Sequence, residues 1–377
     1  MRKSALFFGL LLAACAAARA QWDLQDSRTT ADLRGIDNVG GGVAWASGTN
    51  GTVLRTEDGG YLWQTCPIPP GAEHLDFRGI QAFDANTAIV MSSGKGDLSR
   101  LYKTTDGCQT WKLVFTNPDK DGFWDALHLD HYHHGWLLGD PVKRQFAMFS
   151  SDDAGRTWTR QRNTGLKAQA GGQGAFAASN SSVCEGYFGG IEFGTGGNEG
   201  AYLYLTSDTE IVLSDPSSGA TSFEHEIAWE RNEAPVGSHS ESSGIFSLAG
   251  RWNLTTVPPR LVTIAVGGDY LRPDDFAANS AWTDDGGKTW HAAQTLPHGF
   301  RSAVAYDADA KTWITVGPNG TDISTDDGKN WRALHPDLAL REPPGADRNW
   351  NALSLPFVVG PHGRIGKLNP HALNAPK

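Results

Sequence analysis

The eight-residue stretch TEDGGYLW, residues 56–63, recurs along the chain with small changes. Further copies are TTDGCQTW from residue 104, SDDAGRTW from 151, TDDGGKTW from 283 and STDDGKNW from 324. Their closing tryptophans, Trp63, Trp111, Trp158, Trp290 and Trp331, lie 48, 47, 132 and 41 residues apart. The wide gap spans about two units and contains a weaker copy, LSDPSSGATSF, that ends at Phe223. Repetition at this period is typical of an array of small structural units.

A second phrase precedes each copy. It consists of a short apolar segment, a turn, another apolar segment and then glycines, as in FRGIQAFDANTAIVMSSGKG. Each unit predicts four short antiparallel strands, because β-branched and aromatic residues fill the segments while Gly, Asn, Asp or Pro marks each break. The chain holds seven such units, which predicts an all-β fold, a seven-bladed β-propeller.

The last unit stops after a third strand, GRIGKL, and lacks a fourth. The segment QWDLQ, which begins at Gln21, resembles the tryptophan-led fourth strands of the other units. We therefore expect N- and C-terminal strands to share the last blade, which closes the ring and removes exposed sheet edges. Residues 21–377 are predicted to form a single seven-bladed domain.

The repeated phrase predicts a structural turn between the third and fourth strand of a blade. Its aspartate accepts hydrogen bonds from backbone N–H groups, its glycine adopts positive φ and its tryptophan covers the hairpin. A catalytic group is seldom needed five times around one ring, so these residues are not active-site candidates. The Asp and Trp pairs are Asp58 and Trp63, Asp106 and Trp111, Asp153 and Trp158, Asp285 and Trp290, and Asp326 and Trp331.

Residues 1–20 have the features of an export signal peptide. Two basic residues precede the apolar run SALFFGLLLAACAAA, and Ala18-Arg19-Ala20 offers a cleavage site. In a second interpretation, Leu-Ala-Ala-Cys is a lipoprotein signal that leaves a lipidated Cys15. Both interpretations place the protein in the periplasm or outside the cell. No other segment reaches the roughly 20 apolar residues of a membrane span, so we expect no transmembrane segment.

Three cysteines follow the predicted signal peptide: Cys66, Cys108 and Cys184. An oxidising compartment permits a disulfide, and the odd number leaves one thiol over. Cys66 and Cys108 fall in neighbouring repeats, so we predict that they pair.

Composition narrows the class of partner. The chain has 42 Asp and Glu residues against 32 Lys and Arg residues, which argues against nucleic acid because its binding needs a basic face. No dinucleotide, P-loop, zinc-protease or serine-hydrolase motif occurs, so no cofactor is predicted. The segment DHYHHG, residues 130–135, contains three histidines, but alternate residues of a strand hairpin point apart. We therefore predict no metal site.

The five Asp-containing turns on an exported chain resemble the Asp-box, or BNR-repeat, propellers of the sialidase superfamily. The unit LRGIDNVGGGVAWASGTNGTVLRTEDGGYLW is similar in style to the photosystem II stability and assembly factor family, exported seven-bladed propellers of cyanobacteria and plastids. The second resemblance implies binding of membrane-protein intermediates without catalysis. The first leaves a glycoside hydrolase open, because the same turn occurs in sialidases.

In related propellers the functional face is built from the starts of the innermost strands and from the loops joining strands two and three. The first set is Arg34, Arg78, Asp125, Ser243, Arg301 and Asn351, with Gly174 in the remaining blade. The loops add Lys95, Asp140, Asp269, Tyr270 and His362. Three arginines converging on the axis would hold a carboxylate, a sulfate or an acidic peptide. Alternatively, each arginine pairs with a local acid such as Asp32 or Asp76 and ties blades together.

Two functions are consistent with the sequence. The first is an exported, non-catalytic binding or assembly propeller that holds a protein of the cell envelope, or a small anionic or carbohydrate ligand, at this central mouth. We expect it to be a monomer. The second is a carbohydrate-active glycoside hydrolase. In that case Asp125, Asp140 and Asp269 would supply the two carboxyl groups that glycoside hydrolysis needs.

Overall fold

The structure is a computed structural model. It describes residues 21–130, 132–161, 165–169, 171–186, 189–214, 221–334, 343, 345–369 and 372–373, and within residues 207–227 it describes the backbone only. The predicted signal peptide with Cys15 lies outside the described residues, as does His131.

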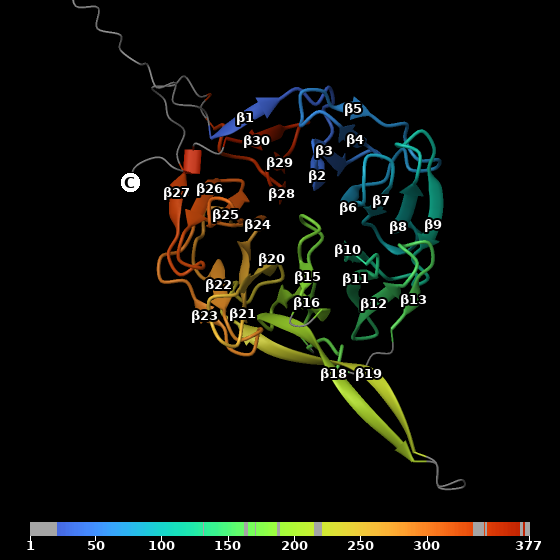
Figure 1. Cartoon of the computed structure of the whole chain (residues 1–377), viewed down its shortest axis with the longest axis vertical. Helices are drawn as coiled ribbons and strands as arrows, with labels where there is room; N and C mark the ends of the chain where they lie inside the picture. Colours follow the sequence, from blue (N-terminus) through green and yellow to red (C-terminus); the bar gives the residue numbers. More distant parts are fainter. Residues whose placement is uncertain are drawn as a thin grey trace, which may run out of the picture.

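Seven antiparallel sheets stand as blades around a common axis (Figure 1). Blade 1 is β2 (Leu33–Gly40), β3 (Val43–Gly48), β4 (Val53–Thr56) and β5 (Gln64–Thr65). Blade 2 is β6 (Phe77–Ala82), β7 (Ala88–Ser92), β8 (Arg100–Thr104) and β9 (Lys112–Thr116), with the 3-10 turn η1 (Gly96–Leu98) before β8. Blade 3 is β10 (Trp124–Leu129), β11 (Gly135–Val142), β12 (Gln145–Ser151) and β13 (Thr159–Arg160).

The next three blades are less regular. Blade 4 is β15 (Val183–Glu185), β16 (Ile191–Gly194), β18 (Ala201–Ser214) and β19 (Thr221–Ala234). Blade 5 is β20 (Ser243–Asn253), β21 (Arg260–Asp269), β22 (Ser280–Thr283) and β23 (His291–Ala292), extended at its inner edge by β17 (Gly196–Gly197) and β14 (Gln173–Gly174). Blade 6 is β24 (Ala303–Asp307), β25 (Thr312–Gly317), β26 (Gly320–Ser324) and β27 (Arg332–Leu334).

Blade 7 closes the ring with strands from both ends of the described chain. It contains β28 (Ala352–Ser354), β29 (Phe357–Val359), β30 (Ile365–Leu368) and β1 (Trp22–Gln25). β1 runs antiparallel to β30, with Trp22 opposite Leu368 and Gln25 opposite Ile365. The predicted seven-bladed fold and its closure are therefore confirmed.

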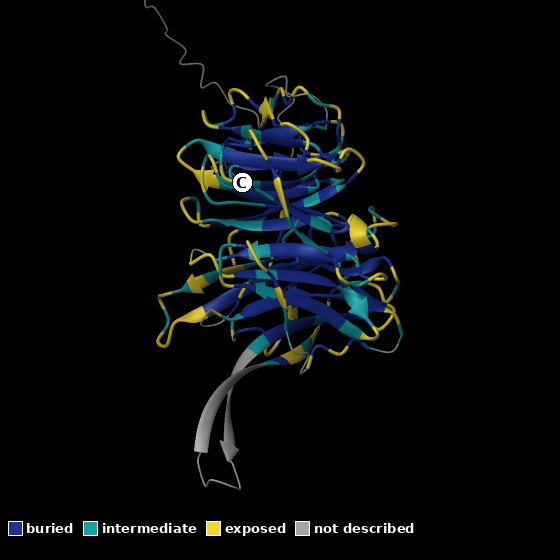
Figure 2. Cartoon of the chain, turned by 90° about the vertical axis from the view of Figure 1, so that its right-hand side faces the viewer, coloured by how far each residue is buried: buried dark blue, intermediate teal, exposed yellow. Residues whose placement is uncertain are grey.

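Neighbouring blades pack through apolar side chains on their facing surfaces. Between blades 7 and 1, Leu33 and Ala44 of blade 1 lie in one buried cluster with Phe357 and Val359 of blade 7. Figure 2 shows the result, with buried strands stacked inside the molecule and exposed residues gathered at the turns. Because each blade buries both faces, no blade is stable without its neighbours.

The repeated turns share one hydrogen-bond pattern. In the first copy, Thr56 Oγ1 donates to Asp58 Oδ1 (2.9 Å), and that oxygen accepts the N–H of Leu62 (3.0 Å). The N–H of Gly60 donates to Thr56 Oγ1 (3.0 Å). The bonds to Leu62 and Thr56 lower the pKa of Asp58. The aspartates that accept the matching bonds in the other copies are Asp106, Asp153, Asp285 and Asp326.

The tryptophans that end these turns are buried beneath the hairpins: Trp63, Trp111, Trp158, Trp290 and Trp331. In each turn, one carboxylate oxygen of the aspartate accepts a backbone N–H of the same turn. The turns hold the third and fourth strands of five blades together.

The second copy differs because a cysteine stands where the others have glycine. Cys108 adopts a φ of 63°, in the left-handed region that favours glycine. It is bonded to Cys66, with the two Cα atoms 5.6 Å apart. This disulfide links the end of blade 1 to the turn of blade 2.

Blade 4 differs from the other blades at the hairpin between its third and fourth strands. Its third and fourth strands, β18 and β19, are each 14 residues long and extend well beyond the ring (Figure 1). The weak copy of the repeat, LSDPSSGATSF, falls at the end of this hairpin, and its residues 215–220 lie outside the described residues.

Replacing Trp22 tests the closure. Trp22 is 1% exposed, its Nε1–H donates to Thr321 Oγ1 of blade 6 (3.0 Å), and its ring lies 5.9 Å from that of Trp350. Trp22→Ala should lower the free energy of unfolding by about 3–5 kcal/mol, measured by urea denaturation. Leu24→Ala, on the same strand but 44% exposed, should cost less than about 1 kcal/mol. Equal effects of the two substitutions would mean that β1 is not packed into blade 7.

Candidate functional site

β-Bulges mark the start of the inner strand in four blades. The register shifts leave an extra residue between Leu33 and Gly35, Phe77 and Gly79, Trp124 and Ala126, and Ile245 and Ser247. The bulged residues are Arg34, Arg78, Asp125 and Phe246. A bulge redirects the side chain of its extra residue, so three of the predicted residues occupy equivalent positions around the axis. In blade 5 the equivalent residue is Phe246 and not Ser243.

Arg34 and Arg78 share one carboxylate. Arg34 Nε lies 3.0 Å from Asp76 Oδ1, and Arg78 Nε donates to Asp76 Oδ2 at 2.8 Å. Both arginine side chains remain about 30% exposed. The predicted pairing with Asp76 is present, and it joins blades 1 and 2 while leaving both guanidinium groups accessible.

The segment 175–182, between β14 and β15, forms the floor of this site. Figure 1 shows it entering the middle of the ring. It is hydrogen-bonded to blades 2, 3, 5 and 6, so it lies across the axis. The bonds are Arg78 Nη1 to Ala177 O (3.1 Å), Asn180 Nδ2 to Ile80 O (3.3 Å), Leu127 N to Asn180 Oδ1 (2.8 Å), Leu248 N to Ser181 O (2.7 Å) and Ser179 Oγ to Ser302 O (2.8 Å).

The floor segment was not predicted from the sequence. Gly174 was expected to begin the inner strand of blade 4, but the structure places it in β14, on the sheet of blade 5. The inner strand of blade 4 is β15, which starts at Val183. Gly79 contributes to the fit, because a Cβ there would lie 2.6 Å from Asn180 Oδ1.

Arg301 does not belong to the arginine group, which corrects the prediction of three converging guanidinium groups. Its side chain is fully buried, and Nη1 donates to Asp322 Oδ2 (2.7 Å) and to Gly320 O (2.8 Å). Burial lowers the pKa of Arg301 to about 10, against the opposing effect of Asp322. Arg301 is therefore part of the packing of blade 6 and is not accessible to a ligand.

Asp125 and Asp140 form a pair of carboxyl groups beside Arg78. Asp125 is 1% exposed, and its Oδ2 has no hydrogen-bond partner among the described residues. Burial, and then the charge of Asp140, raise the pKa of Asp125 well above its ordinary range, although Arg78 opposes them. Burial also raises the pKa of Asp140 to about 6, although its Oδ1 accepts the N–H of Ala175 (3.1 Å). Burial and the neighbouring carboxylate therefore disfavour the ionised form of Asp125, while Asp140, with its pKa of about 6, is mainly ionised at neutral pH.

Asp269 lies in a separate network. It accepts hydrogen bonds from Ser242 Oγ (2.6 Å), Ser240 Oγ (3.0 Å) and Arg272 Nε (2.9 Å). Burial tends to raise the pKa of Asp269, but these bonds outweigh it and lower the pKa to about 2. Asp269 is therefore a fixed anion that holds Arg272, not a partner for Asp125 or Asp140.

Two more predicted residues have structural contacts. Asn351 Nδ2 donates to Leu33 O (2.8 Å) and joins blade 7 to blade 1. Tyr270 is half exposed, and its ring lies 6.0 Å from that of Phe246. Phe246 in turn stacks on Phe176 with their ring centres 3.9 Å apart. Tyr270 thus borders an aromatic group on the blade 5 side of the mouth.

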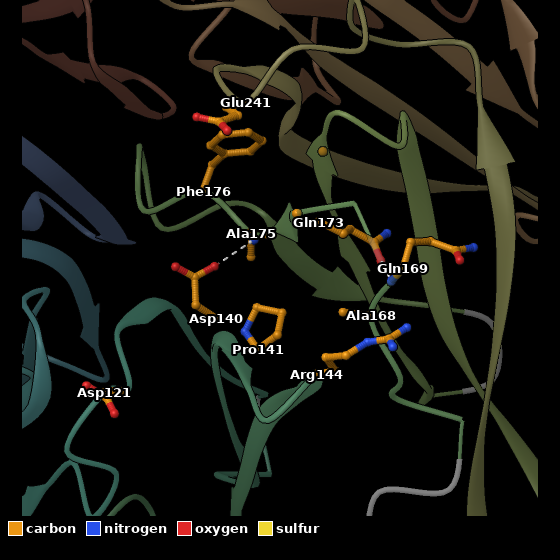
Figure 3. A pocket seen from close by; sticks show the side chains of 13 residues that line it. Asp121, Asp140, Pro141, Arg144, Ala168, Gln169, Gln173, Ala175, Phe176 and Glu241 are labelled. Atoms are coloured by element: carbon orange, nitrogen blue, oxygen red, sulfur yellow. Dashed lines mark hydrogen bonds between the residues drawn. The ribbon is translucent and has the colours of Figure 1, made fainter.

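A pocket of about 500 Å³ opens between blade 3 and the floor segment, and Asp140 is part of its lining. Figure 3 shows Asp140 in it, with Phe176 and Glu241 on one side and Arg144 on the other. Asp121, also in the lining, is ion-paired with Lys95 (2.9 Å).

The histidine-rich segment shows no common ligand geometry in its described part. The ring of His133 packs against Phe83, with ring centres 5.0 Å apart, while His134 Nδ1 lies 3.1 Å from Asp130 Oδ2. Among the described residues, no group of three or more His, Cys, Asp or Glu side chains is placed to hold a metal ion. Within the same residues, no helix is both long and apolar enough to cross a bilayer.

Glu192 on β16 is a second buried carboxyl, away from the mouth residues. It is 1% exposed, and neither of its oxygens has a hydrogen-bond partner among the described residues. Burial raises the pKa of Glu192 to about 7, with a smaller lowering from the Thr263 hydroxyl. Cys184, the remaining thiol, lies opposite it on β15, and burial followed by the charge of Glu192 raises its pKa.

These features define a seven-bladed β-propeller whose inner strands present two accessible arginines and a carboxyl pair above a blocked axis. No protein-family model matches the sequence, and no curated protein matches it. Solved structures do match over nearly the whole chain.

The chain is similar to a structure described as YCF48 bound to D1 peptide, with 17% identity, a TM-score of 0.57, and coverage of 93% of this chain and 97% of that one. YCF48 from Cyanidioschyzon merolae gives the same identity and TM-score and is covered over its full length, with 93% of this chain. The WD40 β-propeller domain of Doa1 matches at 10% identity and a TM-score of 0.52, over 94% of this chain and 98% of that one. At these identities the likeness establishes the fold.

Substitution of Arg301 and Arg34 separates a structural arginine from an accessible one. Arg301→Met leaves Asp322 buried without its main counter-ion, so the free energy of unfolding should fall by about 3–5 kcal/mol in urea denaturation. Arg34→Met, at a side chain 29% exposed, should cost about 1 kcal/mol or less. A small effect of Arg301→Met would contradict its assignment to the packing of blade 6.

Replacing Glu192 should change how stability depends on pH. The folded pKa of about 7 exceeds the ordinary value of 4.5, so between these values the folded state keeps a proton that the unfolded state loses. This stabilisation is complete below about pH 4.5 and is lost as the pH rises to about 7. The stability of Glu192→Gln relative to the unchanged protein should therefore rise by about 3 kcal/mol between pH 4.5 and 8. A pH-independent difference would show that Glu192 ionises normally.

Proposed function

We propose that this chain is an exported, non-catalytic binding propeller that captures a carboxylate-bearing segment of a protein partner at the Arg34–Arg78 pair. The observation that carries the proposal is that both guanidinium groups keep accessible donors. Among the described residues, the Nη atoms of Arg34 and Nη2 of Arg78 have no hydrogen-bond partner. Planar guanidinium groups bind carboxylates through two parallel hydrogen bonds, so the pair suits such a ligand.

The charges of the neighbouring groups favour an anion at this point. Two arginines share the single carboxylate of Asp76, while burial and the charge of Asp140 disfavour the ionised form of Asp125. Their bulged positions and the contact of Arg78 with the floor segment limit the movement of both side chains. A preorganised site loses less conformational entropy on binding, which supports recognition of an extended segment.

The solved structures support a protein ligand. One structural neighbour was solved as YCF48 bound to D1 peptide, so a propeller of this shape has a peptide partner. The Cys66–Cys108 disulfide supports an oxidising compartment, in agreement with the export signal predicted for residues 1–20. We propose the periplasm or the cell exterior as the place of action, with anchoring through a lipidated Cys15 as the alternative to simple cleavage.

A glycoside hydrolase is the alternative function, and the Asp125–Asp140 pair is the observation in its favour. Both carboxyl groups have raised pKa values, as a general acid requires. However, Asp125 is 1% exposed and does not line the pocket that contains Asp140, so a substrate would reach one carboxyl of the pair. We therefore favour binding. Glycan hydrolysis that is lost in Asp140→Asn would reverse this preference.

Peptide binding tests the proposal. The test uses two fluorescein-labelled octapeptides that otherwise consist of Gly, Ser and Ala. The acidic peptide carries two Glu residues and a free C-terminal carboxylate. The neutral peptide carries two Gln residues and a C-terminal amide. The acidic peptide should bind at least about tenfold more tightly in fluorescence polarisation, because a charge-assisted bond contributes about 1.5–3 kcal/mol. Arg34→Gln and Arg78→Gln should each remove most of this preference.

Arg260→Gln is the matched control. Arg260 is also exposed and ion-paired, with Asp284 at 3.2 Å, but it lies beside a repeated turn and away from the mouth. It should bind the acidic peptide as the unchanged protein does. Equal binding of both peptides, or a preference that survives both mouth substitutions, would refute the proposal.

A further inference from the structure

Two anionic groups in the pocket that contains Asp140 have no counter-ion among the described residues. Asp140 and Glu241 both line this pocket, and neither forms an ion pair with any described residue. Asp121, the third carboxylate of the lining, is neutralised by Lys95. Arg144 is the basic residue of the lining, and Figure 3 shows it across the pocket from Glu241. The pocket therefore contains two carboxylates, those of Asp140 and Glu241, that no ion pair among the described residues neutralises.

An aromatic ring, that of Phe176, is also part of the pocket lining. Phe176 is only partly exposed, and its ring is held by stacking on Phe246 at 3.9 Å, which itself meets Phe300 edge to face at 4.6 Å. A cation above an aromatic face is attracted to the electrons of the ring, and nearby carboxylates strengthen its binding. Figure 3 shows Phe176 and Glu241 on the same side of the pocket.

The floor segment connects Asp140 in the pocket to the arginine pair. The N–H of Ala175 donates to Asp140, and the carbonyl of Ala177 accepts from Arg78. Ala175 and Ala177 are two residues apart, so their Cα atoms lie at most about 7 Å from each other along an extended chain. A single short ligand segment can reach both Asp140 and Arg78.

We propose that this pocket binds the ammonium group of a lysine that lies one to three residues from the carboxylate held by Arg34 and Arg78. Asp140 and Glu241 pair with the ammonium, and the ring of Phe176 covers its methylene groups. This inference rests on the proposed function, since it uses the arginine pair as the second anchor. It adds the chemistry of the partner: a segment with closely spaced positive and negative groups, not a purely acidic one.

The geometry explains why a lysine suits the site. Its ammonium is a compact charge on a flexible apolar stem, and the pocket offers two carboxylates without a fixed planar arrangement. Asp140 Oδ1 accepts the N–H of Ala175, and its other carboxylate oxygen can accept a hydrogen bond from a ligand. With a pKa raised to about 6 by burial, Asp140 is ionised at neutral pH and available to pair with the ammonium.

A ladder of labelled peptides tests the proposal. Each peptide has the form Gly-Ser-Lys-(Gly)n-Glu-Gly-amide with n from 0 to 6, and a second series carries norleucine in place of lysine. At n of 0 to 2, lysine should improve affinity about tenfold or more over norleucine in fluorescence polarisation. At n of 6 the improvement should fall below about twofold. A preference that is the same at every n would contradict the spacing.

Substitutions in the pocket should remove the lysine preference alone. Asp140→Asn and Glu241→Gln should each reduce it to about twofold or less, while the preference for Glu over Gln in the same peptides stays. Asp309→Asn, an exposed carboxylate on the β24–β25 hairpin, should leave both preferences unchanged. Thermal unfolding should be used to check that Asp140→Asn is folded. Glu241 is a surface residue, so its replacement should not disturb the core.

The outcomes separate this inference from the proposed function. If Glu is preferred over Gln but lysine is not preferred over norleucine, the ammonium site is wrong and the arginine site stands. If the lysine preference survives both pocket substitutions, the ammonium binds elsewhere and the assignment to this pocket is wrong. If neither preference is seen, both proposals fall.

Discussion

The pairing of β1 with β30 is the constraint on which the rest of the structure depends. It joins the start of the described chain to its last strand and converts seven sheets in a row into a closed ring. Closure places the inner strands of blades 1, 2 and 3 at a common axis, and it also lets the segment 175–182 contact blades on several sides at once. Without closure, blade 7 would keep an open edge, and Asn351 would lose its bond to Leu33 in blade 1.

The two ends of the blades have different roles because their side chains have different partners. At the repeated turns, carboxylates such as Asp58 and Asp326 accept hydrogen bonds from their own backbone, and they are already satisfied. At the other end, β-bulges turn Arg34, Arg78 and Asp125 away from the regular sheet pattern, and these groups are only partly satisfied. Function is therefore expected where polar groups keep unused hydrogen-bonding capacity.

The fold could be predicted almost completely from the sequence, since its signals are local. A turn such as TEDGGYLW determines its own hydrogen bonds, and its period counts the blades. The inner-strand positions Arg34 and Arg78 could be found in the same way, because both follow the pattern apolar-Arg-Gly-Ile. Arg301 follows nearly the same pattern, but Asp322 on β26 provides a buried partner that no local pattern reveals.

The parts that escaped prediction are non-local. The floor segment lacks the apolar alternation of a strand, and its serine and asparagine side chains bond to four other blades. In blade 5, the sequence pattern predicts Ser243 at this position, but the bulge lies three residues further on, at Phe246. The pocket likewise combines residues of blades 3 and 5 with the floor, so only the closed ring brings Asp140 and Glu241 together.

Hydrogen exchange at the amides of β1 tests the closed ring most directly. In the folded protein at neutral pH, the amides of Trp22–Gln25 that pair with β30 should exchange as slowly as those of β29, because all three strands open only when the ring opens. Exchange of the β1 amides at the rate of an unstructured chain end, with β29 still protected, would show that the N-terminal strand does not close the ring.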